Sequence, residues 1–120
     1  MCKVLVVEDE VEVCNALKIF LGLKNYEVET ALDGPTALEK VENFKPHIVL
    51  LDIKMPGMTG IDVLKEIRKI NPEIGVIMVT AILDKKTANR AIQLGAYDYI
   101  KKPINLTRLE TVIKQKMIDI

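Results

Sequence analysis

The chain has 120 residues, 49% of them hydrophobic, and its 17 basic and 17 acidic side chains give a formal net charge of zero. This length predicts one domain spanning residues 1–120, and the balanced charge argues against a broad electrostatic hold on nucleic acid or on an anionic membrane. The two cysteines make no disulfide framework, and no apolar run approaches the roughly 18 residues that cross a bilayer. Together these features predict a cytoplasmic domain.

The first half of the chain alternates short apolar runs with longer amphipathic segments. Residues 3–7 predict a strand, and a helical pattern follows it. Residues 26–32 alternate in polarity, which is typical of an edge strand, and Gly34-Pro35 then opens a second helix. The continuous apolar run at residues 47–51 predicts a strand that is covered on both faces.

The second half repeats this alternation. A third helix ends at Asn71-Pro72, and residues 75–79 and 96–100 predict the fourth and fifth strands. Ala88, Ala91, Ile92 and Leu94 mark the fourth helix, and Gly95 is placed to cap its C-terminus. Five strand–helix alternations predict a single doubly wound α/β domain, in which helices cover both faces of a parallel sheet.

Polar residues stand where each apolar run ends. The first run is followed by Glu8-Asp9-Glu10, the third by Asp52, the fourth by Thr80 and the fifth by Lys101-Lys102-Pro103. Ligands of such sheets bind outside the carboxyl ends of the strands, so these side chains are expected to share one crevice. Because like charges in a crevice repel, we expect Mg²⁺ to neutralise the carboxylates, together with Lys102.

A carboxylate, a hydroxyl, an ammonium group and a Mg²⁺ site point to phosphoryl transfer. The carboxylate is the nucleophile in this interpretation, and an aspartyl phosphate is the product. The sequence contains neither GxxxxGK[ST] nor GxGxxG, so a bound nucleotide is not expected. The phosphoryl group is therefore expected to come from another protein or from a small phosphodonor.

These residues, taken in order, resemble the bacterial two-component response-regulator receiver domain of the chemotaxis-regulator type. The resemblance extends over nearly the whole chain and rests on Glu8-Asp9, Asp52 with Met55-Pro56 and Gly60 behind it, Thr80-Ala81, Tyr99 and Lys102-Pro103. It implies a flavodoxin-like sheet with the strand order 2-1-3-4-5. It also implies a cis peptide bond between Lys102 and Pro103, which is inexpensive only before proline.

By the same resemblance, Asp52 is the phosphoacceptor. The Glu8, Asp9 and Asp52 carboxylates and the backbone carbonyl of Lys54 are then the expected ligands of Mg²⁺. A run of acids after a strand also suits a helix N-terminus, but that role does not explain Asp52 in another crossover.

The resemblance further implies that Lys102 contacts the phosphoryl group and that Thr80 is the switch hydroxyl. Tyr99 is the expected switch ring, although packing against the sheet explains an edge-strand tyrosine as well. Ile82 offers no polar group to align a hydrolytic water, so we hypothesise slow self-dephosphorylation.

The function implied is a phosphorylation-dependent switch that promotes its own phosphorylation without being a turnover enzyme. Its donor is a histidine kinase or a histidine phosphotransfer protein. Its output is a partner protein or an effector domain, reached through the fourth helix, fifth strand and last helix, with the chain as a monomer or a phosphorylation-dependent dimer. Lys85, Lys86, Arg90 and Lys101 make a basic group there that a solvated face explains equally well, and no aromatic residues interleave to favour nucleic acid.

Two alternatives stay open. A degenerate receiver would be a phosphate-independent interaction module, although the acids, the hydroxyl and the lysine are all present. A phosphatase of the haloacid dehalogenase type also forms an aspartyl phosphate, but it needs a second acid two residues after the nucleophile, where this chain has Lys54.

Overall fold

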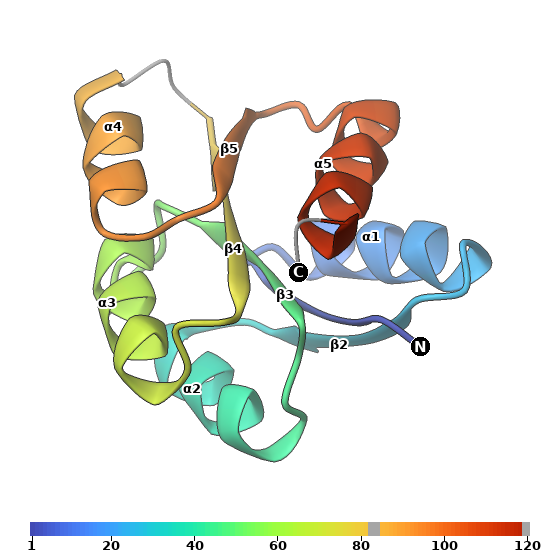
Figure 1. Ribbon diagram of the computed structural model, residues 1–120, viewed down its shortest axis with the longest axis horizontal. Helices are drawn as coiled ribbons and strands as arrows, with labels where there is room; N and C mark the ends of the chain where they lie inside the picture. Colours follow the sequence, from blue (N-terminus) through green and yellow to red (C-terminus); the bar gives the residue numbers. More distant parts are fainter. Residues whose placement is uncertain (82–84, 119–120) are drawn as a thin grey trace.

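The computed structural model describes residues 1–81 and 85–118, and in these residues five strands alternate with five helices (Figure 1). The strands are β1 (Lys3–Val7), β2 (Glu27–Ala31), β3 (Ile48–Asp52), β4 (Gly75–Thr80) and β5 (Asp98–Lys101). The helices are α1 (Val11–Leu23), α2 (Gly34–Asn43), α3 (Gly60–Ile70), α4 (Lys85–Gln93) and α5 (Leu106–Ile118). None of the described helices is long and apolar enough to span a membrane.

The five strands form one sheet in the order β2-β1-β3-β4-β5, and every neighbouring pair is parallel. This confirms the doubly wound α/β fold and the strand order that the resemblance implied. The register pairs Asp52 with Val79 and Thr80 with Lys101. The carboxyl ends of β3, β4 and β5 are therefore aligned at one edge of the sheet.

Helices cover both faces of the sheet (Figure 1). Successive residues of a strand point to opposite faces. In β1, Leu5 and Val7 belong to the hydrophobic cluster under α2, α3 and α4, whereas Val4 and Val6 belong to the cluster under α1 and α5. The continuous apolar runs of the central strands follow from this double coverage.

Local signals set the starts of two helices. At α2, Asp33 is the N-cap, and its side chain accepts a hydrogen bond of 2.8 Å from the backbone N–H of Thr36. At α3, Thr59 and Asp62 form a capping box. The start of α3 matters for the site, because it lies against the end of β3.

Helix α4 is attached to the sheet by small side chains. Its fully buried residues are Ala88 and Ala91, whereas Ile92 is 40% exposed. Each residue turns the helix by about 100°, which carries Ile92 off the face centred on Ala88 and Ala91. Gly95 ends the helix region with φ +105°, as a C-cap glycine should.

The turn after α4 is held by Arg68 of α3. The Arg68 guanidinium donates hydrogen bonds to the carbonyls of Pro72, Ile74 and Gly95. One side chain thus joins the α3–β4 loop to the turn between α4 and β5, at the end of the molecule opposite the aligned strand ends.

Candidate functional site

The candidate site lies at the carboxyl edge of the sheet. Glu8 follows β1, Asp52 ends β3, Thr80 ends β4 and Lys102 follows β5. Glu8, Asp52 and Thr80 are buried, with exposed fractions of 3%, 4% and 7%. Residues far apart in the sequence therefore meet at one place, as the pattern of strand ends predicted.

Lys102 is the centre of the charged group. Its Nζ lies 2.9 Å from Oε2 of Glu8 and 3.1 Å from Oδ2 of Asp52, and 4.0 Å from Oε1 of Glu10. One ammonium group thus bridges the two buried carboxylates. The peptide bond between Lys102 and Pro103 is cis, as predicted.

Burial changes the pKa values of Glu8 and Lys102. Burial is the largest cause that raises the pKa of the Glu8 carboxyl, to about 7; the charge of Asp52 adds to it, while Lys102 and the Glu10 N–H oppose it. For Lys102, burial lowers the pKa, but hydrogen bonds to Glu8 and Asp52 outweigh it, so the pKa of the ammonium is raised. Lys102 therefore stays charged, and Glu8 is the side chain that exchanges a proton near neutral pH.

The second oxygen of Asp52 is held by backbone. Its Oδ1 accepts a hydrogen bond of 3.2 Å from the backbone N–H of Lys54. Directly beneath, Gly60 packs against the chain after β3: a Cβ there would lie 2.8 Å from the Ile53 Cα and would collide with the carbonyl oxygen of Asp52. The glycine that the sequence places behind Asp52 is thus needed for the close approach of α3 to the site.

A group of acids lies at the mouth of the site. Among the described residues, Glu8, Asp9 and Glu10 form a group whose oxygens lie within 4.8 Å of one another. Clustered carboxylate oxygens are the ligands that Mg²⁺ prefers, so the side chains present fit that ion. Asp52 was expected among the ligands, and here its Oδ2 is bound to Lys102.

The predicted switch residues flank this centre. The backbone carbonyl of Thr80 accepts a hydrogen bond of 2.7 Å from the backbone N–H of Lys102. Tyr99 of β5 is half-buried and packs against the cluster under α2, α3 and α4. Ile82, on which the hypothesis of slow dephosphorylation rests, lies outside the described residues.

A groove of about 630 Å³ opens beside the site. Its walls are largely apolar and come from α1 and from the segment after β5, with Lys102 at its rim; they include Val13, Ala16, Leu17, Ile104 and Leu106. The sequence analysis missed this groove, because α1 and α5 are distant in the sequence. It also missed the contact of Glu10 with Lys102, for which the only signal was the third acid after β1.

Three comparisons place these features among known proteins. The family model of the response regulator receiver domain matches residues 4–114. The chain is 36% identical over 115 residues to the regulatory protein AtoC of Escherichia coli, and 39% identical over 114 residues to the transcriptional regulatory protein ZraR of Klebsiella oxytoca. These matches cover 96% and 95% of the chain, but they span only about a quarter of each relative, 25% and 26%.

Solved structures agree over the whole domain. The crystal structure of a CheY-like response regulator receiver domain protein from Methanospirillum hungatei has a TM-score of 0.95 at 33% identity, covering 99% of this chain and 95% of that one. A receiver domain protein from Clostridium thermocellum has a TM-score of 0.93, also at 33% identity, covering 99% and 96%.

Proposed function

The chain belongs to the response regulator receiver domain family, and we propose that it is a switch controlled by phosphorylation of Asp52. The observation that carries this proposal is the bridge that Lys102 makes between Glu8 and Asp52. A lysine held there stands ready to pair with any further negative charge that arrives on Asp52.

In the proposed reaction, an oxygen of the Asp52 carboxylate attacks the phosphorus of the donor. A new O–P bond forms, the bond between phosphorus and the leaving group breaks, and the leaving group departs with its electron pair. The Lys54 N–H orients the carboxylate, and Lys102 turns from the carboxylate to an oxygen of the phosphoryl group. The chain is altered in this step and does not turn over as an enzyme.

We assign Glu8, Asp9, Asp52 and the backbone carbonyl of Lys54 to hold Mg²⁺. When bound, this ion supplies positive charge that neutralises the phosphoryl oxygens in the transition state. The chain's own part is to keep several carboxylates together at one edge of the sheet, where burial and mutual repulsion raise the pKa of Glu8.

The switch is proposed to run from the site to the surface formed by α4, β5 and α5. Thr80 moves toward the phosphoryl group, and Tyr99, which already packs on the core beside α4, repositions with it. Helix α4 suits this role because its buried residues, Ala88 and Ala91, fix it with little apolar area. The phosphoryl group then shifts an existing equilibrium between two arrangements of this surface.

The proposed partners follow from the family. The donor is a histidine kinase or a histidine phosphotransfer protein in the cytoplasm, and the apolar groove beside Lys102 offers it a docking place. The output is an effector domain or a separate protein, since the relatives named as regulatory proteins are about four times as long as this chain. The domain acts as a monomer or as a dimer formed on phosphorylation, and it does not itself bind nucleic acid.

The first test is intact mass after incubation with a small phosphodonor, with and without Mg²⁺. We expect a Mg²⁺-dependent gain of one phosphoryl group, about 80 Da, that hydroxylamine removes and that Asp52→Ala abolishes. The matched control is Asp33→Asn, which changes an exposed acid at the start of α2 and should leave the gain unchanged.

Other outcomes separate the alternatives. If the mass does not change although Mg²⁺ binds, either the chemistry is blocked or a protein donor is required, and repeating the test with a histidine phosphotransfer protein separates the two. If neither phosphorylation nor Mg²⁺ binding is detected, the interaction module replaces the proposed switch.

A further inference from the structure

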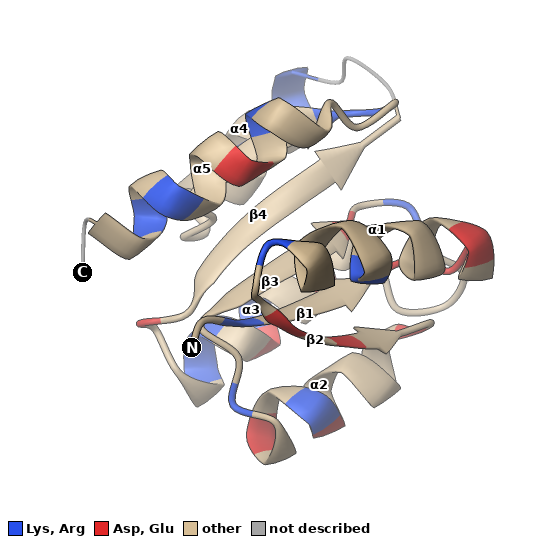
Figure 2. Cartoon of the chain, turned by 90° about the vertical axis from the view of Figure 1, so that its right-hand side faces the viewer, with Lys and Arg blue, Asp and Glu red and all other residues tan. Residues whose placement is uncertain are grey.

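The charges of this neutral chain are unevenly distributed. Residues 85–116 contain eight Lys and Arg against two Asp and Glu, whereas the chain as a whole has equal numbers. Figure 2 shows the same separation, with basic segments on α4 and α5 and acidic segments on β2 and at the start of α1.

Half of these eight cations already have a role within the domain. They are Lys102 in the site, Arg108 paired with Asp98 at 3.4 Å, Lys114 paired with Glu110 at 3.8 Å, and Lys116 placed 5.5 Å above the Tyr97 ring. The others are Lys85, Lys86 and Arg90 of α4 and Lys101 of β5. All four are exposed, and none forms an ion pair with a described residue.

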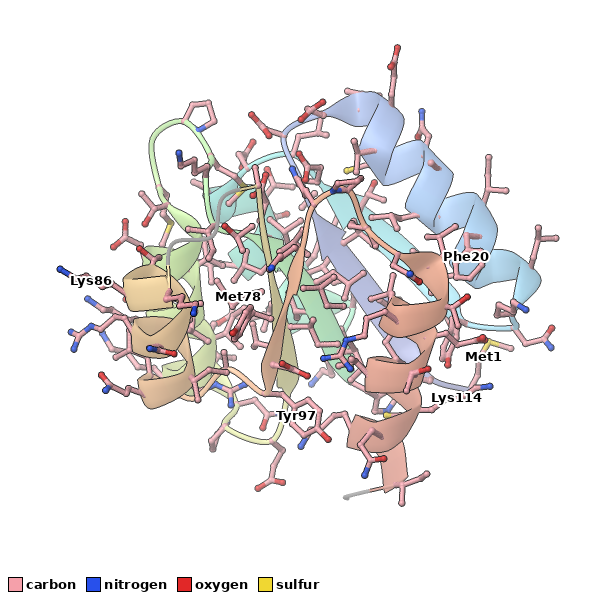
Figure 3. All side chains as sticks on the ribbon, turned by 90° about the horizontal axis from the view of Figure 1, so that it is seen from above. Met1, Phe20, Met78, Lys86, Tyr97 and Lys114 are labelled. Carbon is pink, nitrogen blue, oxygen red and sulfur yellow. The ribbon has the colours of Figure 1, made fainter. Side chains whose placement is uncertain are left out.

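The cations of α4 share one side of the helix. Lys86 and Arg90 are four residues apart, so they lie on the same face, and Figure 3 shows Lys86 projecting away from the molecule. Between Lys85 and Tyr97 the sequence has no acidic residue. We define this basic surface as Lys85, Lys86 and Arg90; the 40% exposed Ile92 lies two turns beyond Lys85, at the edge of the surface.

Lys85 and Lys86 also lie in an electrostatically unfavourable place within α4. Both stand in the first turn of α4, where the helix macrodipole is positive and repels cations. The dipole and the two ammonium groups therefore carry charge of the same sign at this end of α4, which Asp84 precedes in the sequence. An incoming carboxylate would relieve the repulsion and would pair with cations that have no ion-pair partner among residues 1–81 and 85–118.

From this geometry we propose that the basic surface of α4 binds an acidic polypeptide segment. The inference rests on the proposed output role of this surface and names the chemistry of the partner. Three cations spread over about 8 Å of helix rise match several carboxylates in a row better than one anion.

Other occupants fit less well. A symmetric dimer through α4 would place the same cations opposite one another. Nucleic acid would find no aromatic side chain on α4 for stacking, and the nearby mouth of the site carries Glu8, Asp9 and Glu10.

The test measures binding of a labelled synthetic peptide in which Glu lines one helical face and Leu the other, by fluorescence anisotropy at two salt concentrations. A peptide with Lys in place of Glu and a DNA oligonucleotide serve as competing probes. We expect the Glu peptide to bind, to weaken in high salt, and to lose affinity by about tenfold in Lys85→Glu/Lys86→Glu/Arg90→Glu.

The matched control reverses three other exposed cations, Lys18→Glu/Lys65→Glu/Lys69→Glu, and has the same net charge. Its affinity should stay within about twofold of the wild type. Equal losses in both variants, or wild-type binding by the α4 variant, overturn the proposal. DNA binding that exceeds peptide binding and is lost in the α4 variant also overturns it, in favour of a nucleic-acid surface.

Two readouts keep this proposal separate from the proposed function. Phosphorylation of Asp52 is measured on the same α4 variant by intact mass and should be retained. Peptide binding that depends on the α4 cations but does not respond to the phosphodonor supports the acidic partner and contradicts the switch. Phosphorylation without peptide binding supports the switch and overturns the acidic partner.

Discussion

Glu8 keeps a carboxyl group where water scarcely reaches. Its pKa is raised to about 7 in the folded chain, from an ordinary value near 4.5, chiefly by burial. The folded state therefore binds the Glu8 proton more tightly than the unfolded state does. Between these two values, stability falls as the pH rises, because only the unfolded chain releases the proton freely.

The first prediction concerns this proton. Without divalent metal, the free energy of unfolding of the wild type should fall by about 2–3 kcal/mol between pH 5 and pH 8 through Glu8. Glu8→Gln should remove most of that fall, and Glu42→Gln, which changes an exposed acid, should not. Urea unfolding at several pH values measures this, and parallel curves for wild type and Glu8→Gln would contradict it.

The second prediction removes the ammonium group. Lys102→Met leaves Glu8 and Asp52 without their counter-charge, and we expect a loss of about 2 kcal/mol at pH 8. The loss should be smaller at pH 5, because Glu8 then takes up a proton and relieves the repulsion. Lys101→Met is the control: Lys101 is exposed, and its replacement should change stability by less than about 0.5 kcal/mol.

For single residues, the sequence predicted which side chains come together at the carboxyl edge of the sheet, but it did not predict which ion pairs they form. Asp52, Thr80 and Lys102 were placed correctly, because each stands where an apolar run ends and parallel strands align their ends. The bridge from Lys102 to Glu8 depends on side-chain rotamers and on the depth of Glu8, which a strand pattern does not contain.

The third prediction belongs to the contact between β3 and α3. Gly60→Ala puts a methyl group against the backbone of Asp52 and Ile53, so it should cost roughly 2–3 kcal/mol and slow the phosphorylation of Asp52. Gly22→Ala is a control of the same chemistry: no atom lies within 4 Å of its Cβ, and in α1 alanine should stabilise by about 0.5–1 kcal/mol. Urea midpoints of the two variants should therefore move in opposite directions.

The strands and helices could be predicted from the sequence wherever the pattern of apolar residues was strong. The central strands were predicted to within one residue, and Gly95 and Gly34-Pro35 marked helix ends correctly. The pattern that marked α4 did not show which of its side chains are buried: two alanines hold the helix, and Ile92 does not face the sheet. The three carbonyl contacts of Arg68 were beyond prediction, because nothing in a local pattern shows which loops will lie beside it.

The fourth prediction concerns the molecule as a whole. A ligand that binds only the folded chain stabilises every part of it, so Mg²⁺ at ten times its dissociation constant should add about 1.4 kcal/mol to the free energy of unfolding. Asp9→Asn should reduce this gain, and Glu12→Gln, outside the acid group, should retain it. Thermal unfolding with and without Mg²⁺ is the measurement, and equal midpoints would count against the metal site.

The alternation of runs predicted a parallel sheet with helices on both faces, but it did not fix the order of the strands. That order came from the resemblance to a family, and the structure confirms it. Strand order depends on contacts between distant segments, and such contacts leave only weak traces in one sequence.

The position of β5 at the end of the strand order in the sequence has a consequence for co-translational folding. A nascent chain that has emerged only through β4 already carries Glu8, Asp52 and Thr80, but the ammonium group of Lys102 is still to come. Because β5 has only four residues and pairs with β4 alone, the last strand to emerge completes the site. In the proposed reaction, which uses Lys102, phosphorylation of Asp52 would therefore require that β5 has joined the sheet.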